Sequence, residues 1–153
     1  MSELTVLLHP DPRLKKICIP VTNIDKSIKK LCLDMIETMY KYSGVGLAAS
    51  QVGILKRVVV MDCSEEDEKK PIILINPEVI WSSDDISFFE EGCLSIPDIR
   101  EEIKRPSSVR IKFTDISGVL KEDFFEGLWA TCIQHEIDHL NGMLFIDYLG
   151  PIK

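Results

Sequence analysis

His135, Glu136 and His139 form the pattern His-Glu-x-x-His near the C-terminal end of the chain. Two histidines four residues apart lie on one face of a helix, so both imidazoles can reach a single metal ion. Glu136 lies beside that face, where it can hold a water molecule and act as a general base. The pattern therefore predicts metal-assisted hydrolysis. Because a five-residue pattern also arises by chance, a helix with two solvated histidines is the alternative.

The residues after this pattern do not supply a third ligand, which a catalytic metal with an open coordination position requires. Asp147 is the only acidic residue after Gly142. Phe145 stands where the longer pattern His-Glu-x-x-His-x-x-Gly-x-x-His would place a third histidine. The ligand set of the metzincin proteases is therefore excluded.

The part of the chain that precedes the pattern offers three candidates for the third ligand: His9, Cys93 and Cys132. His9 is isolated in a proline-rich N-terminal turn, and Cys132 belongs to the same predicted helix as the two histidines. Cys93 follows a glycine, which predicts a bend, and it can approach the helix from across a cleft. A thiolate binds such a metal strongly. We predict that Cys93 and the two signature histidines bind the metal, with water in the fourth place.

The bulk properties of the chain restrict its class. The 153 residues are enough for one domain with its own core, which we expect to span residues 1–153. Apolar residues make up 45% of the chain, which argues against a disordered protein. The net charge of −7 argues against sequence-independent binding to nucleic acid.

Membrane insertion, secretion and disulfide bonding are not expected. The sequence has no apolar run of the roughly 20 residues that a membrane span needs, and its start lacks the features of a signal peptide. The five cysteines are odd in number and scattered, which suits a reducing compartment. We expect a cytosolic protein without a membrane partner.

An amphipathic helix is predicted in the first third of the chain. Asn23 and Asp25 are both suitable N-caps, and apolar residues then follow helical spacing as far as Tyr42. Gly44 is expected to end this helix.

The remaining elements are predicted to be mostly strands, followed by the helix that carries the signature. Alternating or β-branched apolar residues indicate strands at 57–63, 71–77, 79–81, 86–89, 108–115 and 119–125. The signature helix is expected over residues 126–140, stopped by Asn141 and Gly142. The predicted fold is α+β: one domain of mostly antiparallel sheets packed around a C-terminal metal-binding helix, with an N-terminal amphipathic helix.

Three segments of this sequence resemble the signature motifs of the peptide deformylase family. The segment from Gly44 to Gln51 reads GVGLAASQ, the segment from Glu91 to Ser95 reads EGCLS, and the third reads QHEIDH from Gln134 to His139. They occur in the order and at the spacing of the family, and the segment HPDPRL starting at His9 is similar to its N-terminal region. The resemblance covers nearly the whole chain.

The resemblance implies removal of the N-formyl group from nascent polypeptides that begin with formyl-methionine, with release of formate. It implies one divalent metal ion per chain, Fe²⁺ in the cell, with Zn²⁺, Ni²⁺ or Co²⁺ as substitutes. It also implies a cytosol of bacterial type or an organelle of bacterial origin. Some members dock on the ribosome through a longer C-terminal helix. Because the sequence ends at Lys153, that helix is expected to be short or absent here, and any ribosome contact to be transient.

The resemblance further implies roles at the reacting centre. Glu136 transfers the proton, while the Gln51 side chain and the Leu94 N–H stabilise the oxyanion. Without the resemblance, a surface glutamine is the more common interpretation of Gln51.

The substrate is expected to lie along nearby loops and the signature helix. The backbone from Gly44 to Gly46 can pair with an extended peptide. Glu91 and Gly92 adjoin the site, and Glu91 is expected to pair with Arg105 and so fix the Cys93 loop, with an exposed turn glutamate as the alternative. Arg100 is expected to contact the peptide further along. The predicted lining of the methionine pocket is Val45, Leu128, Thr131 and Cys132.

Two other functions are consistent with the signature alone. A general metalloprotease would cut internal peptide bonds, but it would need one of the third ligands that are missing downstream. A non-enzymatic structural metal site would need a fourth ligand, whereas the sequence offers three and a glutamate placed for base catalysis.

Overall fold

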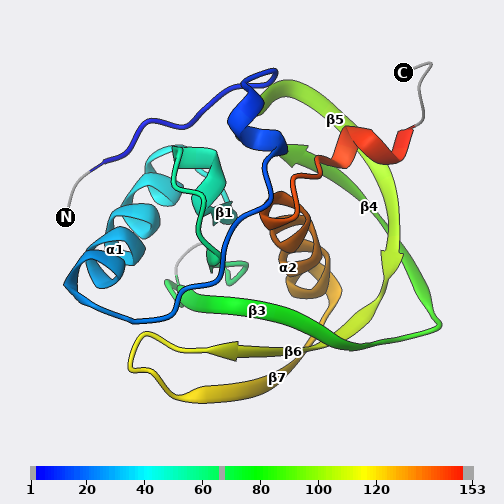
Figure 1. Ribbon diagram of the computed structural model, residues 1–153. Helices are drawn as coiled ribbons and strands as arrows, with labels where there is room; N and C mark the ends of the chain where they lie inside the picture. Colours follow the sequence, from blue (N-terminus) through cyan, green and yellow to red (C-terminus); the bar gives the residue numbers. More distant parts are fainter. Residues whose placement is uncertain (1–2, 66–67, 150–153) are drawn as a thin grey trace.

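The computed structural model describes residues 3–65 and 68–149 of the chain. The expectations for the first two residues and for the segment after Leu149 lie outside this part. Figure 1 shows helix α2 in the middle of the molecule, with strands β3, β6 and β7 on one side, the long β4–β5 hairpin on another, and helix α1 further away.

Helix α1 (Lys26–Lys41) is capped by Asp25, whose side chain accepts the Ile28 N–H at 3.0 Å. Of the two predicted caps, Asp25 is therefore the one that the chain uses. The turn that closes the helix is made at Ser43, which has a φ of 57°, and not at the predicted Gly44. The Gly44 N–H then donates to the Met39 carbonyl at 2.9 Å, which satisfies one of the last helical carbonyls.

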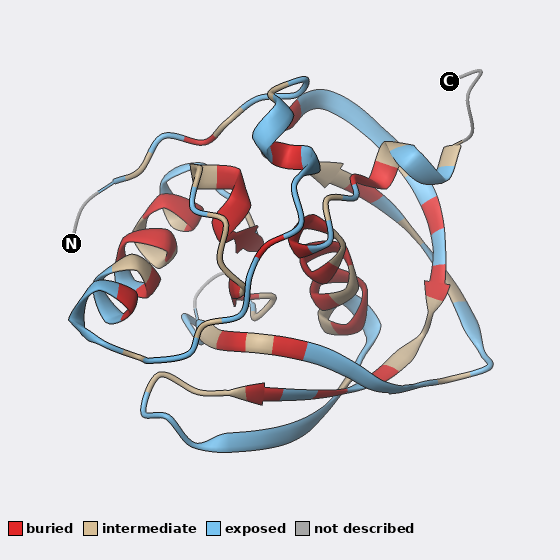
Figure 2. Ribbon diagram, viewed as in Figure 1, coloured by how far each residue is buried: buried red, intermediate tan, exposed pale blue. Residues whose placement is uncertain are grey.

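One face of α1 is buried and the other is exposed, as the amphipathic pattern predicts (Figure 2). The buried face packs against strands β1 and β2. Its apolar members are Ile28, Cys32, Met35 and Met39.

Five strands of the described chain form an antiparallel sheet in the order β1-β2-β3-β6-β7. Their bounds are Gly46–Ala48, Val58–Met61, Ile72–Ser82, Ser108–Thr114 and Leu120–Glu126. Strand β3 is continuous, whereas the sequence predicted two strands there. The register shifts between Ile75 and Glu78, where Asn76 adopts a φ of 53° and Pro77 has no N–H to donate. Such a bulge carries the strand past two residues that interrupt the sequence pattern.

Strands β4 (Ile86–Cys93) and β5 (Ile96–Pro106) form a separate antiparallel hairpin. Strand β5 was not predicted, because more than half of its side chains are exposed, charged residues are frequent in it, and it shows no regular apolar alternation. The irregularity predicted at Gly92 is present as a register shift between Glu91 and Cys93 within β4, and the chain reverses at Leu94 and Ser95. A Cβ on Gly92 would lie 2.8 Å from Nη1 of Arg100, so the glycine makes room for that side chain.

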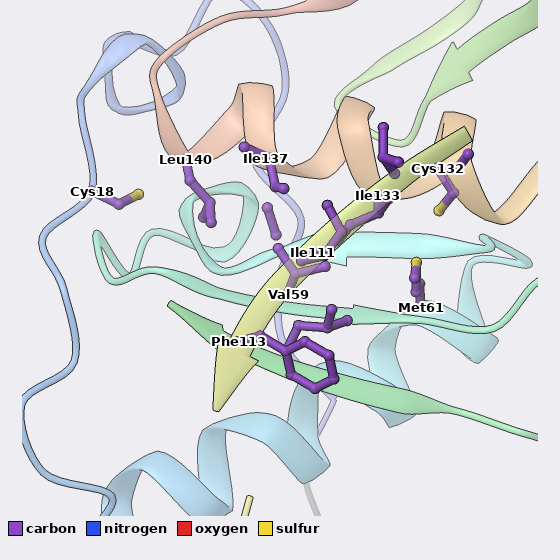
Figure 3. Close-up of a cluster of buried hydrophobic side chains, with 13 residues drawn as sticks. Cys18, Val59, Met61, Ile111, Phe113, Cys132, Ile133, Ile137 and Leu140 are labelled. Atoms are coloured by element: carbon purple, nitrogen blue, oxygen red, sulfur yellow. The ribbon is translucent and has the colours of Figure 1, made fainter. Parts of the chain in front are cut away.

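Helix α2 (Gly127–Leu140) carries the signature and is preceded directly by β7. It ends at Asn141 and Gly142, as predicted; Gly142 has a φ of 75°, and a side chain there would collide with the Lys15 carbonyl. Figure 3 shows the face of α2 that packs on the sheet. That core includes Ile133, Ile137 and Leu140 of α2 and Val59, Ile111 and Phe113 of the sheet.

The predicted fold class is confirmed: antiparallel sheets surround a metal-signature helix, with an amphipathic helix before them. Short 3-10 helices at Pro12–Lys15, Ala49–Val52 and Phe145–Leu149 complete the elements of the described chain. No helix within the described residues combines the length and the apolar character needed to cross a membrane.

Candidate active site

The three predicted metal ligands converge at one end of a cleft between α2 and the β4–β5 hairpin. Cys93 ends strand β4, and its Sγ lies 3.3 Å from Nε2 of His139. The two histidines come from successive turns of α2, and their Nε2 atoms lie 3.2 Å apart. All three ligand atoms lie within 4.8 Å of one another. A single ion can therefore contact all three residues. His9, the remaining histidine, lies in an exposed turn.

The chemistry of this cluster fits a divalent transition metal. Burial opposes a charge on His135, yet hydrogen bonds with Cys93 and Glu91 raise its pKa to about 10. The surroundings of His135 thus favour a positive charge, which a bound metal ion would supply in place of the ring proton. Burial and the neighbouring His135 lower the pKa of His139, so its imidazole is neutral, as a ligand must be. One sulfur and two imidazole nitrogens are ligands that several divalent transition metals accept.

Glu91 fixes the orientation of His135 from behind. The Nδ1–H of His135 donates to Oε1 of Glu91 at 2.9 Å, so that Nε2 faces the ligand cluster. Arg105 donates two hydrogen bonds, of 2.6 and 2.9 Å, to the same carboxylate, and the Arg105 side chain is only 5% exposed. Burial would raise the pKa of Glu91, but the hydrogen bonds from His135 and Arg105 hold it below its usual value. The predicted pairing of Glu91 with Arg105 is confirmed.

Substituting glutamine for Glu91 is expected to weaken metal binding by about 10- to 100-fold, the usual effect of losing a carboxylate that orients a metal-bound histidine. The amide keeps the shape of the side chain but removes one of the two carboxylates that pair with the buried Arg105, the other being Asp138. Chelator competition measures the metal dissociation constant.

Glu90→Gln is the matched control, because Glu90 is exposed on the same strand and pairs with Arg100. An unchanged dissociation constant in Glu91→Gln would show that Glu91 does not support the metal site.

Glu136 lies beside the ligand cluster in a tightly packed environment. A Cβ on Gly46 would lie 2.6 Å from both Oε2 of Glu136 and Sγ of Cys132. This close approach explains why β1 begins with a glycine. Burial raises the pKa of Glu136 to about 7, and its Oε1 has no hydrogen-bond partner among the described residues. Glu136 can therefore gain and lose a proton near neutral pH.

Gln51 is buried at the cleft, with 1% of its surface exposed, which excludes the surface interpretation. Its Oε1 accepts the Ala48 N–H at 2.9 Å, which fixes the identity of the amide atoms. Its Nε2 donates to Oγ of Ser95 at 3.1 Å and lies 3.5 Å from Sγ of Cys93. The amide donor is thus held next to the ligand cluster, while Leu94 follows Cys93 directly in the chain.

The cleft has a volume of about 560 Å³. All the predicted substrate residues line it: Gly44, Val45, Gly46, Glu91, Gly92, Arg100, Leu128, Thr131 and Cys132. The sequence prediction missed further lining residues: Tyr42, Ser43, Glu90, Ile96, Pro97, Asp98 and Ile99. Four of these belong to β5, the strand that was not predicted, so no sequence signal placed them at the cleft.

The fold and the site together define a class of protein. A half-buried cysteine and two buried histidines form a group that can hold a metal, with a buried glutamate and a fixed amide donor beside it. This arrangement is that of a metal-dependent hydrolase with a partly apolar cleft.

Comparison with known proteins identifies the family. The sequence model of the polypeptide deformylase family matches residues 3–153. Among curated relatives, the peptide deformylase of Afipia carboxidovorans is 52% identical over 154 residues, covering 100% of this chain and 90% of the relative. That of a Bradyrhizobium species is 50% identical over 158 residues, with the same coverage.

Solved structures agree with the family match. The crystal structure of a peptide deformylase from Legionella pneumophila has a TM-score of 0.94 and 44% identity, covering 99% of this chain and 88% of that one. The enzyme from Thermotoga maritima has a TM-score of 0.92 and 43% identity, covering 99% and 100%. The chain belongs to the polypeptide deformylase family, whose metal-dependent reaction removes the N-formyl group from nascent peptides.

Proposed function

We propose that residues 1–153 form one catalytic domain whose cleft hydrolyses the formyl amide of formyl-methionine peptides, with the division of roles set out below. One observation carries this proposal: the metal-binding group, Glu136 and the Gln51 amide meet at the same end of the cleft. Each group supplies a different part of amide hydrolysis.

Cys93, His135 and His139 would hold the metal. When bound, a divalent ion there polarises the formyl oxygen and makes water more acidic. We propose Fe²⁺ as the native ion, which is what membership of the family implies. Zn²⁺, Ni²⁺ or Co²⁺ would substitute for it, because a sulfur and two nitrogens bind all of these ions. The Glu91–Arg105 pair keeps the His135 ring aimed at the site.

Glu136 acts as the general base and then as the general acid. It takes a proton from the attacking water and returns it to the departing amine, which would otherwise leave as a poor anion. A pKa of about 7 suits both halves of this role, because neither protonation state is strongly disfavoured near neutral pH.

Gln51 and the Leu94 N–H are proposed as the hydrogen-bond donors for the oxygen of the reacting formyl group. Because Oε1 of Gln51 is occupied by the Ala48 N–H, its NH₂ group must face the Cys93 side of the cleft. Donors fixed in advance stabilise charge that develops during the reaction.

Replacing Gln51 with leucine is expected to lower kcat by about 100- to 1,000-fold with a smaller change in KM, because the lost donor acts mainly in the transition state. Steady-state kinetics with formyl-Met-Ala measure both constants. Gln134→Leu is the control: this half-buried glutamine on α2 bonds the Pro106 and Ala130 carbonyls instead of facing the cleft. Equal kcat values in the wild type and Gln51→Leu would remove Gln51 from the mechanism.

The substrate peptide is proposed to extend along β1 at the open edge of the sheet. Within the described chain β1 pairs only with β2, so its other side offers backbone groups from Gly44 to Gly46 to an incoming strand. The methionine side chain would enter a pocket formed by Leu128, Thr131, Cys132 and Val45, which is 46% exposed. Arg100 lies at the rim, where it pairs with Glu90.

The site should discriminate strongly between formyl and acetyl groups. The crowding of Gly46 against Glu136 and Cys132 leaves little space beside a carbonyl carbon that bears only hydrogen. We expect acetyl-Met-Ala to react on the order of 100-fold more slowly than formyl-Met-Ala, near the upper range of discrimination for one extra methyl group. Release of free Met-Ala from each peptide, followed by amine detection, measures the ratio. Similar rates for the two peptides would contradict a formyl-specific site.

We place the reaction in the cytosol of a bacterial cell, or in an organelle of bacterial origin. Its substrates are chain ends that emerge during synthesis, and a transient contact with the ribosome would bring the enzyme to them.

A further inference from the structure

Cys132, which lines the proposed methionine pocket, lies beside a second cysteine, Cys63. Cys132 is 5% exposed, and its thiol donates to the Val45 carbonyl at 3.6 Å. The same carbonyl accepts the N–H of Asp62 at 2.8 Å. Cys63 is the next residue after Asp62, so this shared carbonyl brings the end of β2 to the side of α2 that carries Cys132.

The two cysteines are in contact. Cys63 is half-buried and packs against the same apolar cluster that contains Cys132 and Met61. Figure 3 shows Cys132 pointing from α2 toward Met61, at the end of the strand that leads to Cys63. A hydrogen bond with Cys63, followed by burial, raises the pKa of the Cys132 thiol well above its usual value. Cys132 is therefore protonated at neutral pH, while Cys63 is the more accessible partner.

We propose that Cys63 and Cys132 form a dithiol site that hydroperoxides oxidise to an intramolecular disulfide. The Cys63 sulfur attacks one peroxide oxygen and the O–O bond breaks; the thiol proton of Cys63 goes to the departing oxygen, so that the products are a sulfenic acid and water. The Cys132 sulfur then attacks the Cys63 sulfur, the S–O bond breaks, and a second water leaves with the Cys132 proton. In total, two thiols and one hydrogen peroxide give one disulfide and two waters.

The disulfide would change the neighbouring catalytic cleft, a consequence that rests on the function proposed above. It removes the thiol that donates to the Val45 carbonyl, so the substrate-pairing segment loses one of its supports. It also draws the Cys132 sulfur from its place against Gly46, where Glu136 is in equally close contact. The methionine pocket and the position of the base are thus both disturbed.

The test uses the full chain loaded with Ni²⁺, because Fe²⁺ itself reacts with peroxide. The enzyme is treated with hydrogen peroxide at low protein concentration and analysed by intact mass, by peptide mapping without reduction, and by formate release. We expect a mass loss of about 2 Da, for two hydrogens, and a linked peptide pair containing Cys63 and Cys132. The value of kcat/KM is expected to fall on the order of 10-fold or more, since a displacement of about 1 Å can cost about 100-fold, and to recover with a phosphine reductant.

Two variants separate this site from the metal ligand Cys93, which peroxide can also oxidise. Cys63→Ser should keep its basal activity, because Cys63 does not line the cleft, and should lose the linked peptide pair and the reversible part of the inactivation. Cys32→Ala is the matched control, since it removes a buried thiol from α1 in a different apolar cluster and should behave as the wild type does.

Other outcomes would overturn the proposal. One is Cys132 remaining a free thiol while Cys63 becomes a sulfinic acid. Another is a disulfide that joins two chains instead of residues of one chain. A linked Cys63–Cys132 pair in a protein that shows no formate release before oxidation would support the dithiol site and count against the proposed function alone.

Discussion

Glu136→Gln is expected to lower kcat for formyl-Met-Ala by about 100- to 10,000-fold, the range for removing a group that transfers protons in the transition state. The amide fills the same volume but cannot accept the proton of the attacking water or deliver it to the amine. Since Glu136 is not among the three grouped ligand residues, bound metal should be unchanged. Thermal stability should be equal or slightly higher, because burying a neutral amide costs less than burying a charge.

Formate release, metal content and thermal unfolding of the same preparation test these three statements together. Glu126→Gln is the control, because Glu126 precedes the same helix, is exposed, and makes no side-chain capping hydrogen bond. A kcat of Glu136→Gln within tenfold of the wild type would show that another group transfers the proton.

Cys93→Ala is expected to have the second large effect, which is loss of the metal. The substitution removes the only ligand that comes from the β4–β5 hairpin and leaves two histidines on one helix. We expect metal affinity to fall by more than about 100-fold, beyond the range for residues that only orient a ligand. When the metal concentration is too low to fill the site, formate release should fall together with the metal affinity.

The loss of metal binding in Cys93→Ala should also change how far added metal stabilises the folded protein. A metal present at about 100 times its dissociation constant stabilises the folded state by about 2.7 kcal/mol. The wild type should therefore unfold at a higher temperature after metal addition, and Cys93→Ala should not under the same conditions. Cys32→Ala, which lacks a buried cysteine far from the cleft, should respond as the wild type does. If Cys93→Ala binds one metal per chain with unchanged affinity, Cys93 is not a ligand.

The metal-binding helix could be predicted because its signal is local. The spacing of His135 and His139 places both on one helix face, and Gly142 marks where that helix ends. The contact between Glu91 and Arg105 could also be predicted from the sequence, since a carboxylate beside a predicted metal ligand needs a partner. The bond from His135 to Glu91 spans 44 residues, and no pattern in the sequence revealed it.

Other features depend on tertiary contacts that leave a weak trace in the sequence. Strand β5 is held by pairing with β4 along most of its length, not by apolar alternation, so it was missed together with the cleft residues it carries. Strand β3 was divided in two because Asn76 and Pro77 interrupt its pattern, whereas a register shift accommodates both. Only the family resemblance suggested a role for Gln51, because a glutamine among small residues has no distinctive spacing.

The most direct test of the account is a metal titration of formate release. The metal-free chain is titrated with Ni²⁺ or with anaerobic Fe²⁺, and formate from formyl-Met-Ala is measured at each ratio for the wild type and for Glu136→Gln. Wild-type activity is expected to rise until one metal ion is bound per chain, while Glu136→Gln binds the same amount and releases almost no formate. No formate from the fully loaded wild type, or equal release by Glu136→Gln, would contradict the account.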